Sequence, residues 1–309
     1  MDNKYIEILM ATYNGSLYVG EQIDSILNQT DSRWHLTVSD DCSDDGTDEI
    51  LDSYVSKYPD KISRVYSNTR FGNAKDHFFW LMDNCSAEYM MFSDQDDVFY
   101  PEKVKCFLDE IVNVESSFGP DKPFIILSDQ KVVDGELEEI APSLMRYQNQ
   151  YFKEFDYRSI IMQNVVTGGA MAFNRELSLL AMSRRDRSRI IMHDWWLGIV
   201  AARFGHIAYM DKPLSAYRQH SHNVVGAKNS RSFSYYKLVL KNTDKLKMTI
   251  KSKKMQALFF KESFAAAIDD EDRFFLDGFS KGRSGVCFYL RYRKEIHGIH
   301  RLLGFSVFG

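Results

Sequence analysis

Short apolar runs rich in β-branched and aromatic residues alternate with stretches of helical spacing along the first half of the chain. In the helical stretches, apolar side chains recur every three or four residues, as in Ile23, Ile26 and Leu27. Strands that alternate with helices form βαβ units, so the pattern predicts an α/β fold with a mainly parallel central sheet flanked by helices. The runs predicted to form strands are Tyr5–Ala11, Trp34–Ser39, Ile62–Ser67, Tyr89–Ser93 and Phe124–Ser128.

The second half is less regular. From Glu136 to Arg158 the pattern loosens, which predicts a loop region beside the site. Further on, residues 226–309 are basic and have helical spacing, so we expect a domain over residues 1–225 and a basic helical C-terminal region over residues 226–309. Between these parts, the predicted elements are an ordered stretch over Asn164–Phe173, helices over Asn174–Met182 and Asp194–Phe204, and a strand over Ile207–Met210.

Charge is unevenly distributed along the chain. The net charge of the 309 residues is −4. Residues 226–309 hold 17 Lys and Arg against 8 Asp and Glu, a net charge of +9, which leaves −13 for the first 225 residues. Because phosphate contacts dominate nucleic-acid affinity, the acidic part does not fit a nucleic-acid-binding groove. The asymmetry indicates two regions with different partners.

Composition is that of an ordinary globular protein, with 44% hydrophobic and 27% charged residues. The four cysteines are scattered with no C-x-x-C pair, which predicts a reduced, cytoplasmic protein. No run approaches the roughly 20 apolar residues that a membrane span needs. The N-terminus lacks the basic and apolar regions of a signal peptide, so we expect a chain that is not exported.

Polar clusters follow three of the predicted strands. They are Thr12–Gly15, Asp40–Gly46 and Asp94–Asp97. Ligands of open α/β sheets bind outside the carboxyl ends of the strands, so these clusters are expected to converge on one edge. Like charges at short range need a cation or a ligand to neutralise them, and oxygen donors favour Mg²⁺ or Mn²⁺. The sequence therefore predicts a divalent metal at this edge.

Each cluster also has a purely structural interpretation. Residues Ser43–Gly46 are ordinary turn and N-cap types, and for this cluster the structural interpretation is the better one. Asp94, Asp96 and Asp97 follow a buried-looking run, and one of them could cap a helix after Pro101, but here a functional role is favoured. The chain has neither a Walker motif nor G-x-G-x-x-G, so a metal must do the work of a glycine phosphate cradle.

Six motifs in order give the sequence a family resemblance. They are MATYNG, VSDDCSDDGT, FSDQDDVFYP, TGGAMAFNREL, HDWWLGIVAARFG and YRQHSHN. Together, from Tyr5 to Gly226, they resemble the inverting glycosyltransferases of family 2, with the GT-A fold, and within them the bacterial rhamnosyltransferase-like members. Each motif alone is weak, but six in sequence are specific. The family's processive members carry Q-x-x-R-W and several membrane spans, which are missing here, so the resemblance implies addition of a single sugar.

The resemblance implies a nucleotide-sugar site. Thr12, Tyr13 and Asn14 would frame the nucleotide. Asp41 would accept the N3 hydrogen of the base, which favours UDP or dTDP donors over CDP, although guanine could also donate to it. Asp94, Gln95 and Asp96 stand where the family has its DxD motif. Asp96 would coordinate Mn²⁺ or Mg²⁺, and Asp94 would reach the ribose or a metal-bound water.

The resemblance also implies a catalytic base and a second metal ligand. Asp194 would take the proton from the acceptor hydroxyl as its oxygen attacks the anomeric carbon. As a structural alternative, Asp194 is the N-cap of its helix. His220 would contribute to the metal, with His222 as the competing candidate and simple solvation as the alternative.

Two further pairs in the motifs stay open. Gly168 and Gly169 let the backbone approach a substrate or relieve a turn. Trp195 and Trp196 stack on an acceptor sugar or, as aromatic residues that open an apolar helix more often do, belong to the core.

The end of the chain carries a basic amphipathic pattern, in which apolar residues recur at helical spacing among arginines and lysines. Such a helix lies on an anionic membrane surface, which would suit a lipid-linked acceptor, or it packs on its own domain or on a second subunit of a homo-oligomer. The apolar positions are Tyr289, Tyr292, Ile296, Ile299 and Leu302.

These observations predict an inverting, metal-assisted glycosyltransferase of cell-surface polysaccharide synthesis. The resemblance implies that its donor is dTDP-L-rhamnose or a UDP-hexose and that its acceptor is a saccharide hydroxyl. The alternatives are a metal-dependent phosphohydrolase or nucleotidyltransferase, which also gathers carboxylates around a metal, and a non-catalytic nucleotide-sugar-binding module. The expected location is the cytoplasm, with peripheral contact at the inner face of the plasma membrane.

Overall fold

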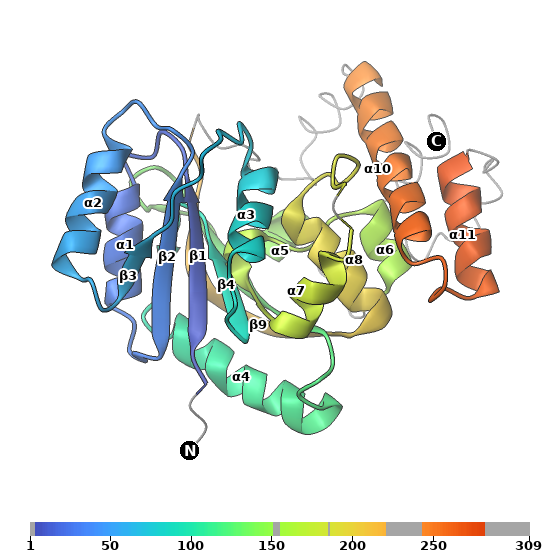
Figure 1. The fold of residues 1–309 in the computed structure, drawn as a ribbon, viewed down its shortest axis with the longest axis horizontal. Helices are drawn as coiled ribbons and strands as arrows, with labels where there is room; N and C mark the ends of the chain where they lie inside the picture. The colour runs from blue at the N-terminus through green and yellow to red at the C-terminus, as the bar shows by residue number, and fades with distance from the viewer. Residues whose placement is uncertain (1–3, 151–154, 185, 221–242, 282–309) are drawn as a thin grey trace.

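The fold is a layered α/β domain extended by two C-terminal helices, as a computed structural model shows (Figure 1). The structure describes residues 4–150, 155–184, 186–220 and 243–281. The strands are β1 (Ile6–Thr12), β2 (Trp34–Asp40), β3 (Ile62–Arg64), β4 (Tyr89–Ser93), β5 (Val98–Phe99), β6 (Phe124–Val133), β7 (Glu139–Ala141), β8 (Met171–Asn174) and β9 (His206–Arg218). The α-helices are α1 (Val19–Leu27), α2 (Thr47–Lys57), α3 (Ala74–Asp83), α4 (Lys103–Phe118), α5 (Leu144–Tyr147), α6 (Tyr157–Met162), α7 (Arg175–Ala181), α8 (His193–Phe204), α10 (Thr243–Ser263) and α11 (Asp270–Lys281).

The first half of the sheet is parallel. Strands β3, β2, β1 and β4 lie side by side in that order, with Ile6 opposite both Trp34 and Tyr89. The connecting segments carry α1, α2 and α3, so the predicted βαβ pattern is confirmed. Every strand of this half ends at the same edge of the sheet. The residues that follow β1, β2 and β4 are therefore brought together there.

The second half makes the sheet a mixed one. Strand β8 is antiparallel to β4 and to β6, while β6 and β9 are parallel. The short β5 is antiparallel to β9. The predicted α/β class is confirmed, and its parallel character is limited to two groups of strands separated by β8.

The region Glu136–Arg158, predicted as a loop, contains regular structure. Strand β7 pairs antiparallel with β6, and the short helices α5 and α6 lie within the region or begin in it. Leu144 and Met145 are buried. The prediction was wrong because these elements are three to six residues long, too short to show a period against the surrounding polar residues. Strands β6 and β9 also run further than predicted, because they pair with each other as far as Val133 and Arg218.

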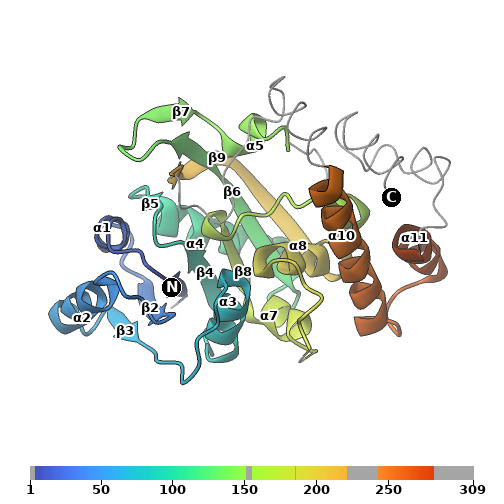
Figure 2. The same cartoon turned by 90° about the horizontal axis from the view of Figure 1, so that it is seen from above.

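Two apolar clusters lie on opposite faces of the sheet, which helices cover on both sides (Figure 2). One is formed with α1, α2 and α4, and includes Leu51 and Phe107. The other is formed with α3, α6, α7 and α8, and continues into α10 and α11 through Phe260 and Phe275. The C-terminal helices therefore share a core with α8.

A buried carboxylate fixes α11 to the domain. Asp272, only 2% exposed, accepts a hydrogen bond from the Tyr157 hydroxyl and pairs with Arg203 Nε at 2.5 Å. A third contact comes from Arg158, at 3.5 Å. Side chains from α6 and α8 thus converge on one residue of α11.

Some predictions fall on residues that the structure does not describe. The predicted domain boundary lies within residues 221–242, and the basic amphipathic pattern lies within residues 282–309. Among the described helices, none combines the length and the apolar character that crossing a membrane requires.

Asp272→Leu should lower the free energy of unfolding by about 2–4 kcal/mol, because it removes the shared acceptor of Tyr157 and Arg203 from a buried site. Urea unfolding of the full chain measures this. Asp270→Asn is the matched control on the same helix. Its carboxylate is exposed and its nearest cation is 4.0 Å away, so a change within about 0.5 kcal/mol is expected. Equal effects of the two variants would contradict the role of Asp272.

Candidate active site

The three polar clusters predicted to converge do meet at the carboxyl edge of the parallel strands. Thr12 Oγ1, at the end of β1, donates to Asp40 Oδ1, at the end of β2, at 2.7 Å. The backbone N–H of Tyr13 donates to Gln95 Oε1 at 2.9 Å, and Gln95 Nε2 donates back to the Tyr13 carbonyl at 3.0 Å. The Gln95 side chain therefore joins the loop after β4 to the loop after β1.

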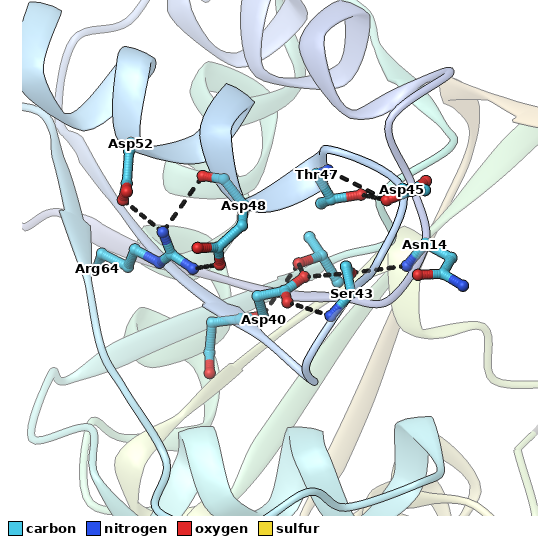
Figure 3. Close-up of polar contacts among 10 residues, drawn as sticks. Asn14, Asp40, Ser43, Asp45, Thr47, Asp48, Asp52 and Arg64 are labelled. Carbon is cyan, nitrogen blue, oxygen red and sulfur yellow. Dashed lines mark hydrogen bonds and ion pairs between the residues drawn. The ribbon is translucent and has the colours of Figure 1, made fainter.

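The loops after β1 and β2 hold each other in place through hydrogen bonds (Figure 3). The backbone N–H of Asn14 donates to Ser43 Oγ at 2.8 Å, and the side-chain oxygen Oδ1 of Asn14 accepts from the backbone N–H of Asp44 at 3.1 Å. Asp45 accepts from Ser16 N at 3.0 Å and from the Thr47 hydroxyl. These bonds agree with the structural interpretation of the Ser43–Gly46 cluster. Asn14 has a φ of 47°, in the left-handed region that asparagine tolerates.

Asp41 is buried and fixes the segment between β3 and α3. Its carboxylate accepts the backbone N–H groups of Phe71 at 2.6 Å and of Gly72 at 2.7 Å. Next to this segment, the guanidinium of Arg70 lies 4.8 Å from the centre of the Tyr13 ring. A carboxylate has about four acceptor positions, so these two bonds leave room for a further donor.

Three carboxylates crowd the turn after β4. Burial, with the charges of Asp96 and Asp194 adding to it, raises the pKa of Asp94 to about 7. Burial and the charge of Asp94 also raise the pKa of Asp97 well above its ordinary value. None of the three caps α4, whose N-cap is Glu102. The helix-capping alternative for this cluster is therefore wrong.

A buried polar network lies beneath these carboxylates. Lys103 is fully buried, donates through Nζ to the Gly169 carbonyl, and lies 3.5 Å from the centre of the Phe99 ring. Burial lowers the pKa of Lys103 to about 7, against the opposing effect of Asp97 and Asp94. Gln130 Nε2 donates to Asp97 Oδ2 at 3.0 Å. Sequence reasoning missed Lys103 and Gln130, because neither lies in a motif and each comes from an element whose pattern is otherwise that of the core.

The two glycines before β8 bring the backbone into the acidic cluster. A Cβ added to Gly169 would lie 2.7 Å from Asp97 Oδ2 and 3.1 Å from Asp94 Oδ2. The backbone N–H of Gly168 donates to Asp194 Oδ2 at 3.2 Å. The glycine backbone therefore approaches the protein's own carboxylates, and its approach to a substrate stays a prediction.

Asp194 is the second residue of α8 and is 8% exposed. Besides Gly168, its carboxylate accepts the backbone N–H of Trp195 at 2.5 Å. The N-cap of α8 is Met192, so Asp194 is not the N-cap. Burial raises the pKa of Asp194 to about 6. A carboxyl group with such a pKa is ionised at neutral pH and is a competent proton acceptor.

His193, beside Asp194, is buried among aromatic rings. Its ring centroid lies 4.3 Å from that of Phe78 and 4.8 Å from that of Phe92. Burial lowers the pKa of His193 to about 3, so its imidazole is neutral. The His193 ring thus packs the start of α8 against α3 and β4.

The end of β9 brings His220 and Arg218 to the turn after β4. His220 Nε2 lies 2.8 Å from Asp96 Oδ2, and its ring centroid lies 4.9 Å from that of Tyr18. Arg218 Nε donates to the Asp96 carbonyl at 2.9 Å, and its guanidinium carbon lies 4.5 Å from the centre of the Tyr18 ring. Arg218 lies in the motif YRQHSHN, but the sequence predicted no role for it. His222 lies outside the described residues.

Trp195 and Trp196 belong to the core. Both are buried, and their indole N–H groups donate to the carbonyls of Ile160 at 2.6 Å and Ala181 at 2.9 Å. This agrees with the core interpretation of the pair. Neither ring is available to stack on a sugar.

Helix α10 braces the segment that leads into Asp194. Gln256 Oε1 accepts the backbone N–H of Ile191 at 2.7 Å, and Glu262 pairs with Arg189 at 2.6 Å. Gln256 is fully buried. The C-terminal helices thus contact the site through this segment.

The donor set at the carboxyl edge fits a divalent cation shared with a ligand. Asp96 and His220 present an oxygen and a nitrogen next to each other. Within the described part of the chain, no three His, Cys, Asp or Glu side chains are grouped as a complete metal site. Mg²⁺ and similar ions are commonly held by one or two protein ligands together with substrate phosphates, which matches this pair.

Sequence comparison finds a match to a family model and similar proteins in other bacteria. The family model described as "Glycosyl transferase family 2" matches residues 7–179. A dTDP-rhamnosyl transferase, RfbG, of Shigella flexneri is 31% identical over 242 residues, which cover 75% of this chain and 78% of that protein. A putative glycosyltransferase, EpsE, of Bacillus subtilis is 31% identical over 32% of this chain and 36% of its own length.

Solved structures share the fold. The crystal structure of S. aureus TarS 1–349 in complex with UDP has a TM-score of 0.54 at 13% sequence identity, covering 98% of this chain and 90% of that chain. A structure of GalNAc-T7 with UDP, GalNAc and Mn²⁺ has a TM-score of 0.54 at 12% identity, covering 85% of this chain and 54% of that chain.

Asp194→Asn should stabilise the folded chain at pH 8 and lose that advantage near pH 4. The carboxyl group binds its proton more tightly in the folded chain than in the unfolded chain, so wild-type stability falls as pH rises from about 4 through about 6. A rise of about two pKa units corresponds to a gain of about 2–3 kcal/mol at pH 8. Urea unfolding at both pH values measures it, with exposed Asp60→Asn as the control for loss of a charge. A gain that does not depend on pH would contradict the burial of an ionised Asp194.

Proposed function

The chain belongs to glycosyl transferase family 2 and is a nucleotide-sugar-dependent glycosyltransferase with the GT-A fold; we propose that it transfers one sugar, with inversion, to a saccharide hydroxyl. The observation that carries the proposal is the meeting of two kinds of carboxylate at one edge. Asp96 stands beside His220, and Asp194 is a buried carboxylate close enough to Asp94 to raise its pKa. The first pair suits a diphosphate with a metal, and the second group suits a proton acceptor.

The donor is proposed to be dTDP-L-rhamnose, with a UDP-hexose as the other candidate. Identity of 31% to a relative named dTDP-rhamnosyl transferase supports the first. Thr12, Tyr13 and Asn14 would border the nucleotide, together with Gln95. Asp41, with acceptor positions left over, would take the N3–H of thymine or uracil.

Asp96 and His220 would hold the divalent ion, and Asp94 would lie beside the ribose or a metal-bound water. When bound, Mn²⁺ or Mg²⁺ supplies charge stabilisation for the departing diphosphate. The likeness to a structure that contains Mn²⁺ supports this choice of ions. Arg218, which holds the Asp96 backbone, would keep the carboxylate aimed at the site.

Asp194 would be the general base. Its carboxylate takes the proton of the acceptor hydroxyl while that oxygen forms a bond to the anomeric carbon and the bond from that carbon to the diphosphate breaks. The Gly168 and Trp195 backbone N–H groups orient it. One displacement on the face opposite the leaving group inverts the anomeric centre, so no covalent intermediate forms.

The cellular setting belongs to the same proposal. Residues 1–225 would form the catalytic domain, and the basic region 226–309, with a net charge of +9, would meet an anionic membrane or a second subunit. A lipid-linked saccharide at the inner face of the plasma membrane, in cell-surface polysaccharide synthesis, would then be the acceptor.

Asp194→Asn should reduce kcat by about 10²- to 10⁴-fold and leave donor affinity unchanged, because the amide cannot accept the proton. Turnover is followed as nucleoside diphosphate released from dTDP-rhamnose and UDP-sugars. Release of nucleoside monophosphate or pyrophosphate by the wild type would indicate a phosphohydrolase or nucleotidyltransferase instead. Near-normal turnover in the variant would overturn the assignment of Asp194.

Asp96→Ala should abolish the gain in dTDP or UDP affinity that Mn²⁺ gives, a loss of at least about tenfold, because one of two protein donors disappears. Calorimetry with and without Mn²⁺ measures it. Asp109→Ala, which removes an exposed carboxylate from α4, is the control. If Mn²⁺ still raised the nucleotide affinity of the Asp96 variant, the assignment of Asp96 as a metal ligand would be wrong.

A further inference from the structure

A cavity of about 330 Å³ lies beside α3, and its lining does not include Asp94, Asp96 or Asp97. Its volume is at the lower end of the range for small-molecule sites. It is bounded on one side by α3 and the segment before it, and on the other by the segment between α7 and α8, which lie side by side in Figures 1 and 2. The lining residues used below are Phe71, Lys75, Phe79, Trp80, Asp83 and Arg187.

Aromatic rings form one wall of the cavity. The ring centroids of Phe71 and Trp80 are 5.5 Å apart, and Phe71 is held from behind by a stacked His77 at 4.7 Å. Trp80 is half-buried. Its indole N–H donates to none of the described residues, in contrast to those of Trp195 and Trp196. The wall therefore offers an apolar face with one hydrogen-bond donor at its edge.

The charges around the cavity balance each other. Arg187 pairs with Asp83 through two bonds of 2.7 and 3.0 Å, and its guanidinium carbon lies 5.0 Å from the centre of the Phe79 ring. Lys75 lies 3.3 Å from Asp76. Two cations and two anions leave no net charge to attract a phosphate. A neutral ligand with one apolar face and many hydroxyls matches these groups, and that description fits a saccharide.

The walls of the cavity contact both the donor edge and the segment that carries the proposed base. Phe71 donates its backbone N–H to Asp41, on the nucleotide side. Arg187 belongs to the segment that leads into α8 and Asp194. Phe79 contacts His193, the neighbour of Asp194, edge to face at 6.5 Å. Both walls are therefore tied to groups that the reaction uses.

We propose that this cavity is a subsite for a neutral sugar of the acceptor, which stacks on Trp80 and accepts hydrogen bonds from its indole and from Lys75 or Arg187. The inference rests on the proposed function, because an acceptor presupposes transfer. It adds an acceptor-binding surface outside the metal and base residues. Sugar specificity at this position would then depend on α3.

Saturation-transfer-difference NMR on the full chain, with methyl α-L-rhamnopyranoside and methyl β-D-glucopyranoside as probes, tests the subsite. Wild-type protein should give a signal with at least one probe. Trp80→Ala should weaken that affinity about tenfold, because the apolar sugar face loses its partner. Trp80→Phe, which keeps a ring, should restore most of it. Phe118→Ala, which removes an exposed ring at the far end of α4, should match the wild type.

Calorimetry with dTDP and UDP in the presence of Mn²⁺ separates the two proposals. Nucleotide binding that is equal in wild type and Trp80→Ala, with saccharide signal lost only in the variant, supports the subsite and shows that the variant is folded. Nucleotide binding without any saccharide signal in the wild type, or with equal signals in both proteins, overturns the subsite and leaves the proposed function standing. Absence of nucleotide binding in the wild type overturns the proposed function itself.

Discussion

Repulsion among the carboxylates after β4 is the constraint on which the site depends. Asp94 and Asp97 lie in a buried turn, and burial together with the charge of Asp96 raises the pKa of both. The chain keeps them there by placing Lys103 and the Gln130 amide beneath the turn and Arg218 on its backbone. These contacts offset part of the repulsion from within. The proposed divalent cation would offset the repulsion that remains.

The mixed sheet places Gln130 and Arg218 next to the carboxylates. The parallel strands β1, β2 and β4 bring the loops with the carboxylates to the edge. Gln130 comes from the other half of the sheet, where β6 runs parallel to β9, and so does Arg218 at the end of β9, with His220 two residues further on. Because β8 is antiparallel between the two groups, the glycines that precede it face the same edge and let backbone, rather than side chains, fill the space beside the acids.

The parallel half of the sheet and the polar groups at its edge could be predicted, because both follow from local sequence patterns. The positions of β1 to β4 and the start of the helix with Asp194 followed from apolar periodicity, and convergence of the polar clusters followed from parallel topology. Lys103 and Gln130 could not be found this way, since a buried polar residue within an apolar pattern is explained only by what lies opposite in space. The two backbone donors on Asp41 were equally hidden, because the approach of residues 71 and 72 depends on the path of a loop.

The contacts of helix α10 limit where the chain can be divided. Its Gln256 and Glu262 hold the stretch before Asp194, and its Phe260 fills the same core as Trp196. Truncation before α10 would expose the apolar surface that this helix covers and would remove the contacts that hold the segment before Asp194. Exchange of the C-terminal helices between relatives would need compensating changes in α8 and in that segment, so these parts of the chain are expected to have evolved together rather than as interchangeable modules.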